Sequence, residues 1–436
     1  MHRSLIGSRV RVSAILATAV AGLLGVLPSG APAVAGTPTM PSSTLSGPSA
    51  AFTYGADLGQ EAPDLQSGND PDAVASAQHV MSSIPMLVDQ ALMSWGVPSP
   101  EPSPGVYVLG PLQARIQMIE STGDTPLIDL ASAPDWMKAP GDIGKLAVPP
   151  LPSHYQDFAN LAATVAAAFP DVKYFAVWKE MHGFWNPATR SYDMQSYDTF
   201  YNDVYTAIKA VRPDALVGGP YISIGSYSHP KGVAPSGPWG YVNPSDLLAL
   251  QQWLTDAVGA DFVALDARNF TNDAGYVADP VTSAGKYAAL DQWVKTQTAL
   301  PIWWIESPTE VTPLGWSTDE QVAARVGVVA EMAASGAAVG MQWQPQQSAS
   351  WPDLGLWTSC LVEGGGQPTA LGQIMPSVTS VLKQPVTQVA GQPTGVLLVS
   401  GTVGTIAVNG TSSFTVASMG SLQLVLAPYQ VRVLLN

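Results

Sequence analysis

The sequence predicts an α/β protein, namely a (β/α)8 TIM barrel with a small C-terminal β domain. Short apolar runs alternate with amphipathic stretches between residues 51 and 382, and eight of each are found. Two of the apolar runs end in an acid, Glu180 and Glu306, and tryptophans precede both acids. After Gln384 the pattern changes to short strands with turn residues such as Asn409-Gly410, which predicts the C-terminal domain.

The N-terminal 35 residues predict a secretory signal peptide. Three arginines precede an apolar stretch at 14–27, and small-residue cleavage patterns follow within 31–35. An uncleaved membrane anchor is the alternative, although the stretch is shorter than the ~20 residues of a spanning helix. Residues 36–50, rich in Pro, Ser, Thr and Gly, predict a linker. The expected organisation is a signal peptide at 1–35, a linker at 36–50, a barrel at 51–384 and a β-sandwich-like domain at 385–436.

The composition fits an extracellular protein and disfavours several partners. Charged residues make up 12% of the chain, about half the roughly 25% of typical soluble domains. The formal net charge is −15, and removal of residues 1–35, with three arginines and no acid, leaves 15 − 33 = −18. Nucleic acid is therefore not expected as a partner. Cys360 is the only cysteine, which excludes an intramolecular disulfide and a cysteine-based zinc cluster.

Hydrophobic periodicity places the elements of the barrel. The strands are expected at 51–57, 90–95, 125–131, 173–179, 215–221, 261–266, 301–306 and 337–344. The helices are expected at 73–88, 112–121, 155–169, 196–211, 244–258, 283–298, 318–335 and 370–382. Ser196 and Ser317 are plausible helix N-caps and Gly336 a plausible C-cap. In the C-terminal domain, strands are expected at 386–389, 394–399, 404–408, 413–417 and 422–435.

Glu180 and Glu306 form the candidate catalytic pair. The C-terminal ends of barrel strands face the active site, and strands four and seven lie across its mouth from one another. Two carboxylates in such positions can flank a glycosidic bond at the ~5 to 5.5 Å separation of a retaining double displacement. A lone glutamate here is more often a solvated loop carboxylate, but the repeated arrangement beside tryptophans favours catalysis.

The segment Trp178 to Asn186, Trp-Lys-Glu-Met-His-Gly-Phe-Trp-Asn, resembles the W-N-E-x-x-G-F-W block of clan-A retaining glycoside hydrolases, most closely family 39, the xylosidase and iduronidase family. Residues 133–138, 218–221 and 301–306 are also similar to that group, and the resemblance covers about residues 51–382. It implies that Glu180 is the acid/base and Glu306 the nucleophile, with no metal or cofactor.

The chain departs from this family pattern at Lys179, where the family has an asparagine that binds the sugar 2-hydroxyl. Lys179 could donate to a hydroxyl, lower the pKa of Glu180 or bind an acidic sugar. Strand alternation offers an alternative, in which Lys179 points away from the sugar. The expected second strand also carries no arginine, which clan members often use there to orient the nucleophile.

Several residues near the strand ends are candidates for substrate binding. Asp266 ends strand six and could bind a sugar hydroxyl or Arg268, or simply cap a loop. Trp343 and Gln344 end strand eight, where an aromatic floor can stack on the sugar, although a buried packing tryptophan is the alternative. The remaining candidates lie in loops or at a strand end and are His182 and the aromatic residues Trp136, Trp185 and Tyr221, each of which could equally serve packing.

These observations predict a secreted retaining glycoside hydrolase that acts on an oligo- or polysaccharide such as a cell-wall glycan. A catalytically retired glycan-binding protein on the same barrel is the first alternative, with Lys179 as the mark of lost catalysis. A cell-envelope interaction protein that binds through residues 385–436 is the second. Neither membrane association after signal cleavage nor a cofactor is expected, and the sequence does not indicate the oligomeric state or the sugar.

Overall fold

The computed structural model describes residues 51–58, 68–93, 97–232, 234–307, 315–347 and 354–436. The predicted signal peptide and linker lie outside these residues, and so does the end of the predicted second strand at 94–95.

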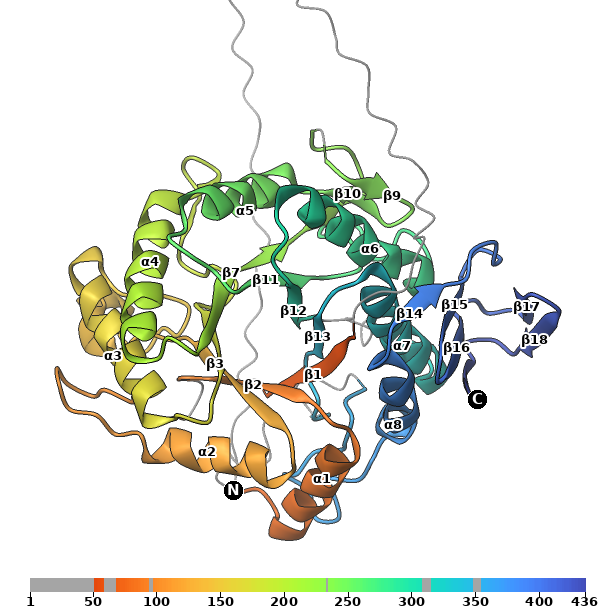
Figure 1. Cartoon of the computed structure of the whole chain (residues 1–436), viewed down its shortest axis with the longest axis horizontal. Helices are drawn as coiled ribbons and strands as arrows, with labels where there is room; N and C mark the ends of the chain where they lie inside the picture. The colour runs from red at the N-terminus through yellow and green to blue at the C-terminus, as the bar shows by residue number, and fades with distance from the viewer. Residues whose placement is uncertain (1–50, 59–67, 94–96, 233, 308–314, 348–353) are drawn as a thin grey trace, which may run out of the picture. The chain divides into compact units, whose positions relative to one another are not determined.

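Eight parallel strands form a closed barrel in the order β1-β13-β12-β11-β7-β4-β3-β2, with helices around it (Figure 1). The strands are β1 Thr53–Asp57, β2 Leu87–Ala91, β3 Thr125–Leu130, β4 Tyr174–Val177, β7 Leu216–Ile224, β11 Phe262–Ala267, β12 Ile302–Glu306 and β13 Val339–Gln342. This arrangement confirms the predicted (β/α)8 TIM barrel.

The helices follow the strands of the barrel and mostly match the predicted ranges. They are α1 Pro71–Ser83, α2 Gly110–Ser121, α3 Tyr155–Ala168, α4 Met194–Val211, α5 Pro244–Asp256, α6 Pro280–Gln297, α7 Thr318–Ser335 and α8 Ala370–Leu382. Ser317 caps α7 as predicted, and Gly336 ends it with a left-handed φ of 86°. Ser196 is not the cap of α4, because Asp193 accepts a hydrogen bond from the Ser196 amide and starts the helix earlier.

The predicted boundary between the first helix and the second strand is wrong. Helix α1 ends at Ser83 instead of residue 88, and β2 begins at Leu87 instead of residue 90. Pro85 accounts for the difference, because proline disfavours a helical conformation at the preceding residue, and Ile84 is extended. The shift brings Asp89 and Gln90 into a buried strand of the barrel.

Large side chains fill the barrel interior below the rim. Trp303 of β12 stacks on Phe262 of β11, with ring centroids 3.9 Å apart. Gly218 of β7 makes room for this stack, since a Cβ there would lie 2.2 Å from the Phe262 ring. Trp304, the next residue along β12, faces outward and donates to Asp291 of α6. The interior is therefore closed below, and the open end lies where the strands finish.

Small antiparallel sheets lie in the loops that follow two barrel strands. Strands β5 Trp185–Asn186 and β6 Ser191–Tyr192 follow β4. Strands β8 Ser226–Tyr227, β9 Ser236–Gly237 and β10 Gly240–Val242 follow β7. Strands β9 and β10 lie beside α6 at the edge of the barrel (Figure 1).

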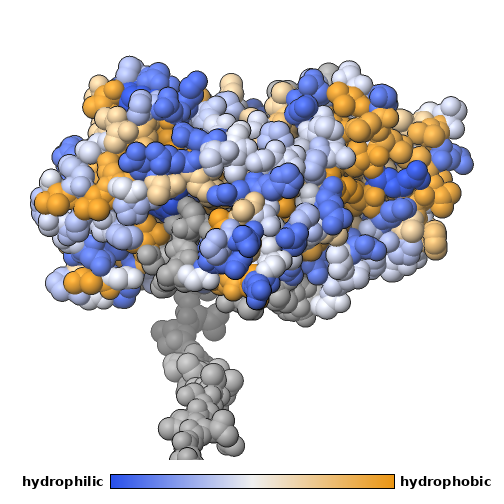
Figure 2. All heavy atoms as spheres, turned by 90° about the horizontal axis from the view of Figure 1, so that it is seen from below, coloured by the Kyte–Doolittle hydropathy of each residue, from blue (hydrophilic) through white to orange (hydrophobic). Residues whose placement is uncertain are grey.

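The C-terminal region forms two antiparallel sheets, of which the larger packs on α7 and α8 and the smaller contacts β15 of the larger. One contains β14 Val386–Gln388, β15 Val396–Gly401, β16 Gly404–Asn409 and β19 Val431–Leu435, and the other β17 Thr415–Met419 and β18 Leu422–Leu426. The predicted run at 422–435 is two strands, since Pro428 and Tyr429, with a φ of 55°, form a turn. Apolar residues are exposed at this end of the molecule (Figure 2), among them Phe414, Val425 and Leu435.

Candidate active site

Glu180 lies in a strained turn beyond the end of β4. The strand ends at Val177, three residues earlier than the acid, so the predicted strand at 173–179 is too long. Trp178, Glu180 and Met181 have positive φ values of 67°, 48° and 49°, which are costly for residues with side chains. Trp178 is buried and its Nε1 donates to the His182 carbonyl oxygen at 2.8 Å. The packed tryptophan thus anchors the turn that presents Glu180.

Two β-bulges, one in β12 and one in β7, lie beside β11 and set the orientation of side chains at the open end of the barrel. Ile305 of β12 has no partner in the register with β11, so Asp266 pairs with Glu306 directly after Leu265 pairs with Trp304. Tyr221 of β7, with a φ of 50°, likewise has no partner in the register with β11. A bulge turns the following side chain to the other face of the strand. Glu306 consequently points toward the barrel axis, although Trp304, two residues earlier on the same strand, points outward.

Lys179 points into the barrel and contacts the opposing glutamate. Its Nζ lies 2.6 Å from Asp57 Oδ2 and 3.2 Å from Glu306 Oε2. Tyr221 donates its hydroxyl to the same Glu306 oxygen at 3.3 Å. The strand-alternation argument fails here because β4 has already ended before Lys179. Lys179 and Tyr221 together hold one oxygen of Glu306.

Glu180 has partners that favour its charged form. His182 Nε2 lies 2.9 Å from Glu180 Oε2, and a hydrogen bond joins Glu180 to Asp266. Burial alone would raise the pKa of Glu180, but His182, Asp266 and Lys179 outweigh burial and lower the pKa to about 2. Asp266 shows the opposite behaviour: burial and the charges of Glu180 and Glu306 raise its pKa well above the usual value. The two shifts therefore favour the proton of this carboxyl pair on Asp266, which also accepts from Ser223 Oγ at 2.6 Å.

Glu306 lies among acids. Burial, with the charges of Glu180 and Asp57, raises its pKa to about 8 even though Lys179 acts to lower it. Asp89 and Asp129 lie on the same inward faces of β2 and β3, and neither carboxyl has a hydrogen-bond partner in the described part of the chain. Burial is also the main reason that the pKa of Asp129 rises to about 7.

Sequence inspection missed Asp57, Asp89 and Asp129, although a usable signal was present. Asp57 ends an apolar run in the same way as the two glutamates, and Asp129 lies within the run of β3. Asp89 was hidden by the misplaced second strand. Asp57 and Asp129 both lie at or near the C-terminal ends of expected strands, as Glu180, Glu306 and Asp266 do, so their positions alone mark them as candidates.

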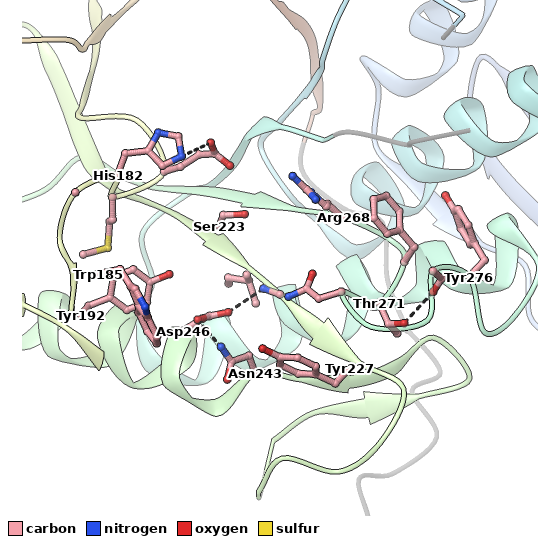
Figure 3. A pocket seen from close by; sticks show the side chains of 18 residues that line it. His182, Trp185, Tyr192, Ser223, Tyr227, Asn243, Asp246, Arg268, Thr271 and Tyr276 are labelled. Carbon is pink, nitrogen blue, oxygen red and sulfur yellow. Dashed lines mark hydrogen bonds and ion pairs between the residues drawn. The ribbon is translucent and has the colours of Figure 1, made fainter. Parts of the chain in front are cut away.

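A cavity of about 750 Å³ opens beside Glu180 (Figure 3). His182 and Trp185 line it, as expected for substrate-binding residues, and Trp185 is 42% exposed. The loops after β7 and β11 supply the rest of the wall, including Tyr227, Arg268 and Tyr276. Lys179, Tyr221, Asp266 and Glu306 are not among the described residues that line it, and the last three of these are buried.

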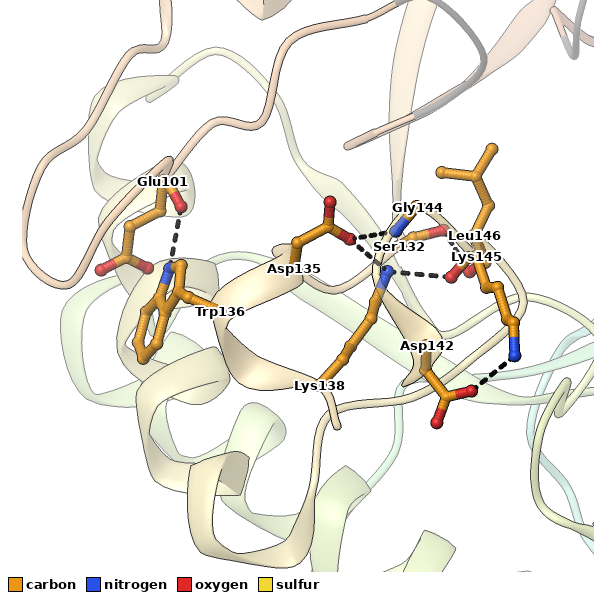
Figure 4. A network of polar contacts seen from close by, with 9 residues as sticks. All are labelled: Glu101, Ser132, Asp135, Trp136, Lys138, Asp142, Gly144, Lys145 and Leu146. Atoms are coloured by element: carbon orange, nitrogen blue, oxygen red, sulfur yellow. Dashed lines mark hydrogen bonds and ion pairs between the residues drawn. The ribbon is translucent and has the colours of Figure 1, made fainter. Parts of the chain in front are cut away.

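The other predicted binding residues lie away from this cavity. Trp136 packs edge-on against His154, and its Nε1 donates to the Glu101 carbonyl oxygen at 2.9 Å (Figure 4). Trp343 is half-buried beyond the end of β13, and its carbonyl accepts from Arg325. Gln344 is buried, and neither atom of its side-chain amide has a partner within the described residues. The structure thus groups Lys179, His182, Tyr221 and Asp266 with the two glutamates, but not Trp136.

Within the described residues there is no group of three or more His, Cys, Asp or Glu side chains arranged to hold a metal ion. Among those same ranges, no helix combines the length and the apolar character that crossing a membrane requires.

Comparison with known proteins supports the barrel and the predicted resemblance. No protein-family model and no curated protein matches the sequence. A family 39 glycoside hydrolase from Bacteroides cellulosilyticus WH2 is similar in structure, with a TM-score of 0.60 and 15% identity over 88% of this chain and 81% of that one. A monomeric β-xylosidase from Caulobacter crescentus CB15 gives 0.56 and 15% over 86% and 76% of the two chains.

A further similar structure is that of a protein whose name states no activity. It is a conserved exported protein from Bacteroides fragilis, with a TM-score of 0.65 and 12% identity over 89% of this chain and 98% of that one. At such identities the similarities show a shared fold. The first of these structures belongs to family 39, the family that the segment around Glu180 resembles, and so do similar structures from Caulobacter crescentus and Xanthomonas axonopodis pv. citri.

Proposed function

We propose that the protein is a secreted retaining glycoside hydrolase in which Glu180 is the acid/base and Glu306 the nucleophile. The observation that carries this proposal is the meeting of these two carboxyl groups at the open end of a closed barrel, where both feel the charge of Lys179 and a 750 Å³ cavity is lined by Glu180. A cavity on that side suits a leaving group, because the acid must reach the oxygen that departs.

The reaction proceeds in two displacements. Glu306 attacks the anomeric carbon while Glu180 gives its proton to the leaving oxygen, so that one C–O bond forms as another breaks. Glu180, now ionised, then takes a proton from water, and the resulting hydroxide equivalent displaces Glu306. No cofactor enters either step.

Asp266 supplies the proton that the first step needs. In the unliganded site the pKa shifts favour an ionised Glu180 that is hydrogen-bonded to a protonated Asp266. Transfer within this carboxyl pair places the proton on Glu180, where the leaving oxygen can accept it. A substrate that displaces water and separates His182 from Glu180 favours this transfer, since both changes raise the pKa of Glu180.

The substrate is a glycan, for example one from a cell wall. Trp185 and Tyr227 present aromatic rings to the cavity, and the apolar face of a pyranose or furanose stacks on such rings. Asn243 and Arg268 add side-chain donors to its wall, which suits the hydroxyl groups of a second sugar.

The test is hydrolysis of a panel of aryl glycosides and cell-wall polysaccharides by wild type and by Glu306→Gln. We expect the wild type to release sugar from at least one substrate and the variant to release none. A mechanism-based 2-fluoro sugar should label Glu306, as read by peptide mass spectrometry. Equal silence of both proteins on every substrate would refute the enzyme, and a label on another residue would refute the assigned roles.

One observation favours the retired glycan-binding protein as a second candidate. The acid of a working pair is protonated before the reaction, whereas Glu180 has a pKa of about 2 in the unliganded site. Calorimetric binding of a glycan by wild type, unaltered in Glu306→Gln and without any turnover, would support that function instead.

A further inference from the structure

Lys179 occupies a position that gives it two acidic partners at once. Its Nζ lies 2.6 Å from Asp57 Oδ2 at the end of β1 and 3.2 Å from Glu306 Oε2 at the end of β12. The Asp57 side chain is 3% exposed and the Glu306 side chain 9%, so water contributes little to holding either charge. The ammonium group is therefore the main stabilising charge for both carboxylates.

The surroundings of Glu306 make such a cation necessary. The titratable groups that face this part of the barrel, among the described residues, are Asp57 on β1, Asp89 on β2, Asp129 on β3, Lys179, Glu180 and His182 after β4, Tyr221 on β7 and Asp266 on β11. Lys179 is the only lysine or arginine in this set, and His182 is paired with Glu180. Strand β2, Leu87–Ala91, contributes Asp89 and Gln90 at this level and no arginine.

A buried carboxylate among other acids accepts a proton unless a cation compensates its charge. A protonated Glu306 cannot attack the anomeric carbon, because the nucleophile is the carboxylate. We propose that Lys179, held in place by Asp57, is the positioning residue that stabilises the ionised form of the nucleophile Glu306. This role rests on the proposed function, and it assigns Lys179 to the nucleophile rather than to the sugar.

Asp57 sets the strength of this effect. As an anion it anchors the ammonium group, but its own charge also disfavours the charge on Glu306. The two residues therefore act on Glu306 in opposite directions, and this opposition distinguishes an electrostatic role from general damage to the fold.

The experiment is a direct titration of Glu306 in the full-length protein. The chain is labelled with 13C in the glutamate carboxyl groups, and the Glu306 resonance is assigned by its absence in Glu306→Gln. Titration midpoints are measured for wild type, Lys179→Met, Lys179→Arg and Asp57→Asn. No substrate is used, so the result does not depend on whether the glycan panel shows hydrolysis.

We expect the midpoint of Glu306 to rise by about 1 to 3 pH units in Lys179→Met, which is the usual effect of an adjacent opposite charge. It should fall in Asp57→Asn and stay near the wild-type value in Lys179→Arg, which keeps the charge. If a substrate is found, the acid limb of kcat/KM should move in the same directions. An unchanged midpoint in Lys179→Met, or shifts of the same sign in both variants, would overturn the proposal. If Lys179→Met does not fold, Asp57→Asn decides alone, and a constant or raised midpoint overturns it.

Discussion

The two sides of the barrel mouth differ in what surrounds their glutamate. On the open side Glu180 meets His182, Asp266 and a cavity, and these partners lower its pKa to about 2 despite burial. On the side that we call closed, Glu306 is only 7% exposed and lies near Asp57, and burial with neighbouring charge raises its pKa to about 8. The comparison shows that the same residue type, placed after two strands of one barrel, acquires opposite pKa shifts from its surroundings.

The largest expected effect is the loss of hydrolysis on replacing either glutamate, with a different dependence on the leaving group. Glu306→Gln removes the nucleophile and should lower kcat about 10⁴-fold or more on every substrate. Glu180→Gln should lower kcat about 10² to 10⁴-fold for sugar leaving groups, and far less for activated aryl groups that need no proton.

Steady-state rates on nitrophenyl and disaccharide substrates measure this contrast. Azide provides a control, because a small anion can enter the open side of Glu180→Gln and replace the missing base, whereas it cannot restore Glu306→Gln to retaining hydrolysis. If the leaving-group dependence appears in Glu306→Gln instead, Glu306 is the acid/base and Glu180 the nucleophile.

A smaller effect is expected for Asp266→Asn, which keeps a hydrogen-bond donor toward Glu180 but removes the exchangeable acidic proton. We expect kcat to fall about 10- to 100-fold on disaccharides, as part of the total contribution of acid catalysis. The loss should shrink on activated aryl glycosides. An equal loss on both classes would mean that Asp266 only positions Glu180.

The sequence was sufficient for the barrel because periodicity and strand-end acids are local features. All eight strands and eight helices were predicted, and the errors at β2 and β4 came from boundaries that Pro85 and the left-handed turn at Trp178 decide. The site was predictable only in part. Strand alternation would place Glu306 on the outer face with Trp304, and no local pattern predicts the bulge at Ile305 that turns it inward.

The contacts of Lys179 could not be predicted for the same reason. They join residues 57, 179 and 306, which the closure of the barrel brings together. A single sequence carries no signal for contacts between positions so far apart in the chain. Trp136 illustrates the reverse error. It was a reasonable binding candidate by its place after a strand, yet its indole donates to Glu101 and packs against His154.

A comparison of two tryptophans sharpens the description of the open side. Trp185→Ala removes an exposed ring from the cavity wall, so we expect KM for an oligosaccharide to rise about tenfold, the effect of one lost stacking interaction. Trp136→Phe keeps the packing but removes the indole donor, and KM should change less than twofold. A larger KM effect at Trp136 would mean that the substrate extends beyond the cavity.

The smallest effect concerns the stability of the closed side. Asp129 is buried without a hydrogen-bond partner in the described chain, and burial raises its pKa to about 7, against about 3.9 in the unfolded state. Between these two pKa values the folded state holds the extra proton, so the free energy of unfolding falls as pH rises from about 4 to 7. Asn is neutral throughout, so Asp129→Asn should raise the Tm at pH 8 by a few degrees and leave it nearly unchanged at pH 5.

Calorimetric melting at both pH values measures this difference, with Asp214→Asn as the control. Asp214 is an exposed carboxylate paired with Arg212, and the hydrogen bond from Arg212 is the main cause that lowers the pKa of Asp214 to about 2. Replacing this carboxylate should therefore give no gain in Tm at pH 8. Equal gains for Asp129→Asn at the two pH values would show that the buried carboxyl is unfavourable for reasons other than its charge. A gain at pH 8 alone would mean that the Asp129 anion destabilises the folded state. Despite burial, that anion also adds to the negative charges that raise the pKa of Lys179 and keep its ammonium group protonated beside Glu306.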